Sequence, residues 1–155
     1  IMAKKQAPIE SNTAEVVYSS HVIEHLDDES VLFFLKEVYR ILKKNGVLRI
    51  ECPNIDLYYQ AVKNEDFWFF YKIYRNHFDK DDNLDFRGPS IYQLFLYSFA
   101  SHISTINPYK DIEKIDDLNF AELFSSLSKN QFLDYCSSRC DPDLNRDMPA
   151  CHINW

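Results

Sequence analysis

The chain has 155 residues, about the length of one domain, and its 17 basic and 24 acidic residues give a net charge of −7. Only two glycines are present, Gly46 and Gly88, which excludes a Walker loop and a GxGxxG loop, because both need several glycines within a few residues. The acidic surface repels phosphate backbones, so we expect no nucleic-acid partner.

The first third of the chain alternates between strand and helix patterns. Residues 14–20 are a short β-branched and aromatic run, which predicts a strand. Acidic residues at 27–29 then favour a helix N-terminus, where the dipole stabilises negative charge. The apolar residues that follow recur at spacings of three and four, which predicts one amphipathic face. They are Leu32, Leu35, Val38, Tyr39 and Leu42.

A second strand follows this helix. Lys43 and Lys44 suit a helix C-terminus, and Asn45-Gly46 can take the left-handed conformation that ends a helix. Residues 47–52 then predict a strand that Pro53 ends. Two strands joined by a helix of ~17 residues through short connections form a βαβ unit with parallel strands and a right-handed crossover.

The rest of the chain reads as helical and rich in aromatic residues. We expect helices over residues 56–75, 90–103 and 119–138, with an acidic loop at 79–85 and a polar connector at 107–117. The aromatic residues of the first of these helices are core by default, and some of them could line a substrate pocket. They are Tyr58, Tyr59, Phe67, Trp68, Phe70, Tyr71 and Tyr74.

Two stretches of the first third carry a family pattern. The first reads P-I-E-S-N-T-A-E-V-V-Y-S-S-H-V-I-E-H-L, and the second reads R-I-L-K-K-N-G-V-L-R-I-E-C-P-N. In order and spacing, residues 8–54 resemble the middle of a class I S-adenosylmethionine-dependent methyltransferase of the broad type 11 group. Asn45 stands where this family often has glycine, and Glu15 stands where it usually has aspartate.

This resemblance implies an α/β, Rossmann-like fold with part of a methyltransferase sheet, followed by a large helical region. We expect residues 1–155 to be one partial methyltransferase domain, with a cofactor side at 1–55 and a substrate side at 56–155. The family's glycine-rich cofactor loop would precede Ile1, and its last strands would follow Trp155. The chain is thus expected to be an internal segment whose own cofactor binding is incomplete.

The expected site lies where the first strand ends, because open parallel sheets bind ligands at the carboxyl ends of their strands. In the resembling family this stretch lies under the sulfonium and amino acid part of S-adenosylmethionine. His21 is the candidate catalytic base, since an imidazole can accept a proton near pH 7; alternatively, it caps the next helix. The expected cofactor-binding residues are Ser19, Ser20, His21, Val22, Glu24 and His25.

Three patterns suggest metals, but we expect no metal site. The string H-x-x-E-H at residues 21–25 is superficially similar to a zinc motif, but it lies between a strand and a helix and lacks a third ligand. The alternating acidic residues of 79–85 lack the glycine and glutamate of a calcium loop. Cys136, Cys140 and Cys151 are expected to be free thiols. The alternative is a zinc site formed by these three cysteines and His152.

The resemblance predicts a methyltransferase that transfers a methyl group from S-adenosylmethionine to a small molecule or a sugar. The alternative is an inactive, methyltransferase-like scaffold or interaction module. An isolated pair of strands would expose its edges, so we also expect self-association through a sheet edge. No apolar run reaches the ~18 residues of a membrane span, and residues 1–6 lack the apolar core of a signal peptide. We therefore expect a cytoplasmic protein.

Overall fold

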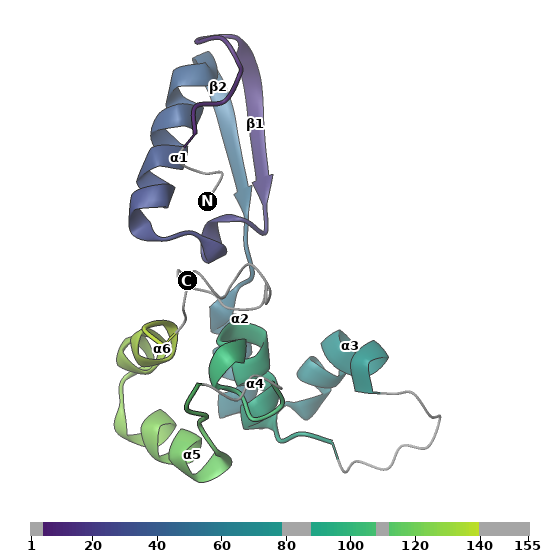
Figure 1. Ribbon diagram of the computed structural model, residues 1–155. Coiled ribbons are helices and arrows are strands. Elements are labelled where there is room, and N and C mark those ends of the chain that lie inside the picture. Colours follow the sequence, from purple (N-terminus) through teal and green to yellow (C-terminus); the bar gives the residue numbers. More distant parts are fainter. Residues whose placement is uncertain (1–4, 79–87, 108–111, 140–155) are drawn as a thin grey trace. The chain divides into compact units, whose positions relative to one another are not determined.

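A computed structural model describes residues 5–78, 88–107 and 112–139, the side chains of 74–78 excepted, as a mixed α/β fold in two units (Figure 1). The described part of the first unit extends to Pro53, and that of the second runs from Asn54 to Arg139. None of the described helices is long and apolar enough to cross a membrane.

The first unit is a βαβ arrangement, as predicted. Strand β1 (Ala14–Ser20) pairs in parallel with β2 (Leu42–Glu51), and helix α1 (Asp28–Ile41) connects them and lies along the strands (Figure 1). The register aligns Val16 with Val47 and Ser20 with Glu51, so both strands end at the same edge. A short 3-10 helix, η2 (Ile23–His25), joins β1 to α1.

Local sequence sets the boundaries of α1. The Asp27 carboxylate accepts a hydrogen bond from the Ser30 N–H at 2.7 Å, which caps the first turn. Helix α1 ends at Ile41, and β2 begins at Leu42, earlier than the predicted strand at 47–52. Asn45 takes the left-handed conformation with φ 67°. Gly46 does not, but a Cβ there would lie 2.9 Å from a methyl carbon of Leu42.

The predicted amphipathic face of α1 is wrong for three of its five residues. Val38 is buried, but Leu32, Leu35 and Tyr39 are exposed, and Tyr39 is 85% exposed. The buried side of the helix is instead formed by Ser30, Val38 and Ile41. Apolar residues occur on more than one side of α1, so spacing alone did not identify the packed side.

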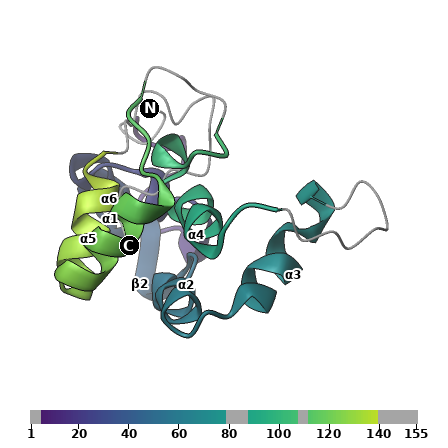
Figure 2. The ribbon, with the colours of Figure 1, turned by 90° about the horizontal axis from the view of Figure 1, so that it is seen from below.

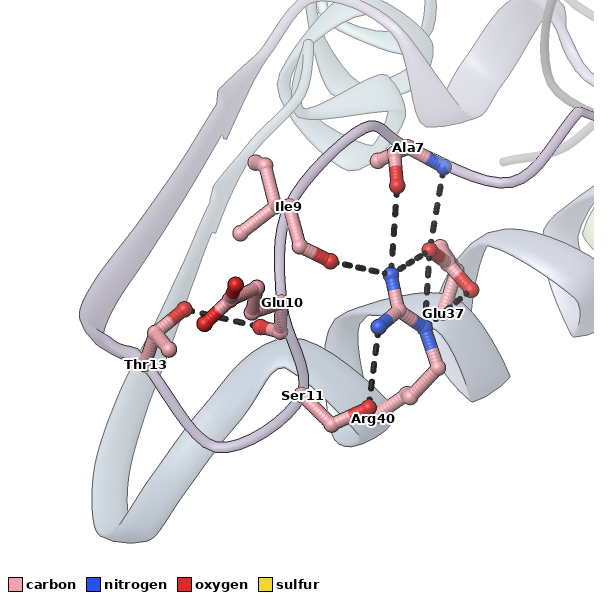
Figure 3. A network of polar contacts seen from close by, with 7 residues as sticks. All are labelled: Ala7, Ile9, Glu10, Ser11, Thr13, Glu37 and Arg40. Atoms are coloured by element: carbon pink, nitrogen blue, oxygen red, sulfur yellow. Dashed lines mark hydrogen bonds and ion pairs between the residues drawn. The ribbon is translucent and has the colours of Figure 1, made fainter.

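A polar network fastens the segment before β1 to the end of α1 (Figure 3). The Arg40 guanidinium pairs with Glu37 and donates to the carbonyl of Ile9 at 2.8 Å and to the Ser11 hydroxyl at 3.0 Å. Glu37 in turn accepts a hydrogen bond from the Ala7 N–H at 3.0 Å. The network fixes where the chain enters β1.

The second unit is helical, but its predicted long helices are divided. The span 56–75 overlaps two helices, α2 (Ile55–Lys63) and α3 (Phe67–Phe78), and the span 119–138 overlaps α5 (Asp117–Ser126) and α6 (Lys129–Ser137). The predicted helix at 90–103 is α4 (Ile91–Phe99) followed by the 3-10 turn η3 (Ser101–Ile103). Glu65, with φ 53°, lies between α2 and α3, where a continuous helix is impossible.

Aromatic residues form the core of this second unit. Helix α4 packs on α2, and α5 lies next to α6 (Figure 2). Phe132 of α6 lies 5.1 Å from Phe120 of α5 and 6.0 Å from Phe95 of α4, measured between ring centroids. All three rings are fully buried. Of the predicted aromatic stripe, Phe70 is buried, Trp68 is 56% exposed, and the side chain of Tyr74 lies outside the described residues.

Candidate functional site

The candidate site lies at the carboxyl end of β1 and β2, in the first unit. The backbone N–H of His21, the residue after β1, donates to the carbonyl of Glu51, the last residue of β2, at 2.9 Å. His21 has φ 54°, which is uncommon for a residue with a side chain and is a form of strain found at functional sites. This turn ends β1 and leads into η2.

Three predicted site residues come together after this turn. The Nδ1 atom of His21 lies 3.5 Å from Oε1 of Glu24, and the Nε2 atom of His25 lies 3.8 Å from the same oxygen. The Glu24 side chain is only 4% exposed, whereas the His21 side chain is 69% exposed. One buried carboxylate thus lies between two imidazoles, only one of which is largely open to solvent.

The Glu24 carboxylate has an unusual environment. No described residue donates a hydrogen bond to either of its oxygens. Burial of an ionised carboxylate without donors is costly, so such groups are normally paired or hydrogen-bonded. The two imidazoles lie beside it, at 3.5 Å and 3.8 Å, and the arrangement suits a group that interacts with a ligand or moves a proton.

The remaining predicted residues lie around this cluster. Ser19 and Ser20 are the last two residues of β1 and alternate between the faces of the sheet, with Ser19 buried and Ser20 half-buried. Val22 precedes η2 and is exposed. Among the described residues, no hydrogen bond joins these three side chains to the Glu24 carboxylate, so they lie at the same strand end without entering the cluster.

Sequence analysis missed a second carboxylate at this edge. The Tyr18 hydroxyl donates to Oε2 of Glu51 at 2.5 Å, and Arg49 forms an ion pair with Oε1. The hydrogen bond from Tyr18 is the main reason why the pKa of Glu51 is lowered, followed by the one from Arg49, and the nearby His21 adds to the effect. The predicted βαβ unit was the available signal, because parallel strands end at the same edge of a sheet.

Of the three suggested metal patterns, H-x-x-E-H at residues 21–25 coincides with this cluster, and the other two include residues outside the described ones. Among the described residues, no group of three or more His, Cys, Asp or Glu side chains could hold a metal ion. The acidic loop at 79–85 and the residues Cys140, Cys151 and His152 lie outside the described residues. Cys136 is buried, and burial raises the pKa of its thiol to about 12, which keeps it protonated.

Among known protein families, one matches the sequence of the first unit. Residues 2–50 match the model of a family described as a methyltransferase domain. The match confirms the resemblance to class I S-adenosylmethionine-dependent methyltransferases over this part of the chain. The matched residues contain β1, all of α1, and β2 up to Ile50. This family generally uses S-adenosylmethionine. No curated protein and no solved structure matches the chain.

Proposed function

We propose that the chain takes part in methyl transfer from S-adenosylmethionine to a small-molecule or sugar acceptor. The observation that carries this proposal is the overlap of two features. The methyltransferase match covers residues 2–50, and within these residues β1 ends in the strained turn at His21. In an open parallel sheet, the carboxyl ends of the strands are where ligands bind.

The chemistry of the strand end fits the charged part of this cofactor. The buried Glu24 carboxylate lies near His21, and it favours a cationic group over an anionic one. The cofactor would supply an electrophilic methyl group. In this proposal Ser19, Ser20, Val22 and His25 line the cofactor side, Glu24 faces its positive charge, and His21 accepts the acceptor's proton.

Binding of S-adenosylhomocysteine to this chain tests the proposal. A ligand that binds only the folded state stabilises it by about 2.7 kcal/mol at a concentration of 100 times Kd. We therefore expect excess S-adenosylhomocysteine to raise the melting temperature. Ser20→Tyr, which fills the strand end, should abolish the rise, and Ser125→Tyr on the exposed side of α5 should keep it. An unchanged melting temperature of the unmodified chain would contradict cofactor binding by this chain.

A second candidate function is a methyltransferase-like interaction module, favoured by the outer face of the β1–β2 sheet. Val16, Tyr18 and Val47 are each more than half exposed on this face. Parallel sheets are normally covered on both faces, and open strand edges pair readily with another chain. We propose a second copy of the chain as the partner, since Arg49 and Glu51 give the face both charges. Sedimentation over a range of concentrations tests this self-association.

A further inference from the structure

The His21–Glu24–His25 cluster carries an inference about how the candidate base is held, and this inference rests on the proposed methyl transfer. We infer that Glu24 is a positioning residue that fixes His21 with its proton on Nδ1 and leaves the lone pair of Nε2 available to an acceptor. The starting observation is geometric, because the His21 nitrogen that lies within ion-pair distance of the carboxylate is Nδ1, 3.5 Å from Oε1 of Glu24.

Only one nitrogen of the neutral His21 ring is left to accept a proton. A neutral imidazole carries one proton, on either Nδ1 or Nε2, and a carboxylate next to one nitrogen selects the tautomer with the proton there. With the proton of His21 on Nδ1, the basic lone pair lies on Nε2. The side chain is 69% exposed, so this nitrogen belongs to a ring that solvent and an acceptor can reach.

The burial of the Glu24 carboxylate costs free energy. This carboxylate is buried, and no described residue donates a hydrogen bond to it. At 3.5 Å and 3.8 Å, the two imidazoles lie outside good hydrogen-bond distance, as is common at catalytic sites without their ligands. A residue kept only for stability would be expected to have its donors in place.

The chemical consequence is a restriction on the acceptor. Methyl transfer forms a bond between the acceptor atom and the methyl carbon and breaks the bond between that carbon and the sulfonium sulfur. The sulfur keeps the bonding electron pair and becomes a neutral thioether, and the acceptor's proton passes to Nε2 of His21. A base in this place is useful for an acceptor that must lose a proton, such as a hydroxyl group or an amine, but not for a thioether.

The same carboxylate makes opposite demands on the two rings. Oε1 of Glu24 approaches His21 at Nδ1 and His25 at Nε2. The proton of His21 should therefore be on Nδ1, while that of His25 should be on Nε2. Opposite tautomers on two neighbouring histidines give this inference a spectroscopic readout that needs neither cofactor nor acceptor.

Nitrogen NMR of the ¹⁵N-labelled full chain tests this at a pH where both imidazoles are neutral, with His21→Gln and His25→Gln used to assign the two rings. We expect the Nδ1–H form for His21 and the Nε2–H form for His25. Glu24→Leu, which removes the carboxylate beside Nδ1, should convert most of the His21 signal to the Nε2–H form. Glu24→Gln keeps an oxygen acceptor and should convert less of it, and Glu29→Gln, on the exposed first turn of α1, should convert none.

The outcomes separate this inference from the proposed function. An Nε2–H form of His21 in the unmodified chain would overturn the positioning role of Glu24, whatever happens to the variants. An unchanged His21 signal in a folded Glu24→Leu variant would also overturn it. The expected tautomers together with no binding of S-adenosylhomocysteine would leave the positioning role in place and contradict the cofactor proposal instead.

Discussion

At the scale of single residues, the Glu37–Arg40 pair shows how a surface interaction can depend on pH. The side-chain hydrogen bond from Arg40 is the largest cause that lowers the pKa of the Glu37 carboxyl below its usual value near 4.5, while desolvation opposes it. A carboxyl whose pKa is lower in the folded state contributes stability above its unfolded pKa and loses it as pH falls through the folded pKa.

We predict that Glu37→Gln lowers the melting temperature near pH 7 and that the difference from the unmodified chain shrinks below about pH 4.5. The same variant should increase amide hydrogen exchange at Ala7, whose N–H donates to Glu37. Glu10→Gln, which leaves this ion pair intact, serves as the control for removing a nearby carboxylate. A difference that stays constant down to pH 2 would contradict the linkage.

The two described cysteines should differ sharply in reactivity. Cys52 is exposed, whereas Cys136 is buried and has its thiol pKa raised to about 12 by desolvation. Because the thiolate is the reactive form, an alkylating reagent at pH 8 should modify Cys52 and spare Cys136 until the chain is unfolded. Peptide mass spectrometry can read each site separately. Equal modification of both sites in the folded chain would contradict the burial of Cys136.

At the scale of secondary-structure elements, the break between α5 and α6 depends on a capping box. The Ser128 hydroxyl accepts a hydrogen bond from the Gln131 N–H, and the Gln131 side chain accepts one from the Ser128 N–H at 3.1 Å. We predict that Ser128→Ala lowers the free energy of unfolding by about 1 kcal/mol. Denaturation in urea measures this loss, and Ser125→Ala within α5 should cost much less.

Gln93 connects several segments of the second unit, and we expect its substitution to cost more stability than that of Ser128. Its buried amide nitrogen donates to the Ile115 carbonyl and to Asp117, both at 2.9 Å, and its oxygen accepts from the Thr105 N–H at 2.8 Å. Gln93→Ala leaves these partners unsatisfied, so we predict a loss of about 3 kcal/mol in the free energy of unfolding. Gln60→Ala, on the exposed side of α2, is the urea-denaturation control and should cost less than 1 kcal/mol.

These elements also show what the sequence could predict. The bounds of β1 were correct because a β-branched run lies between turn residues, and the βαβ connection followed from the length of the segment between the strands. The helix breaks were missed because aromatic residues continue across them. Ser128 and Gln131, with capping-box spacing, were a readable signal, whereas the positive φ of Glu65 depends on the packing of α2 and α3.

The geometry of the candidate site could not be predicted from the sequence, and Glu51 was missed. The motif identified His21, Glu24 and His25, but regular helical spacing would not have described them, because His21 has a left-handed backbone and η2 contains only three residues. The proximity of Glu51 to His21 arises from the parallel register of the two strands. Such long-range placement cannot be read from local spacing.

At the scale of the whole molecule, the exposed apolar face of the first unit predicts association between copies. Large exposed apolar patches commonly mark interaction sites, and Val47 is 57% exposed beside the exposed side chains of Val16 and Tyr18. We predict that Val47→Lys weakens self-association by at least tenfold, or about 1.4 kcal/mol, because the copies would have to bury a new cation.

Sedimentation equilibrium measures this effect. Leu118→Lys, at a position 82% exposed in the second unit, adds the same charge away from the sheet and should leave association unchanged. A monomer at all concentrations in the unmodified chain, or equal association of the Val47→Lys variant, would contradict a second copy as the partner. If the chain associates and S-adenosylhomocysteine also raises its melting temperature, the outer face and the strand end serve separate roles, and Val47→Lys should leave cofactor binding intact.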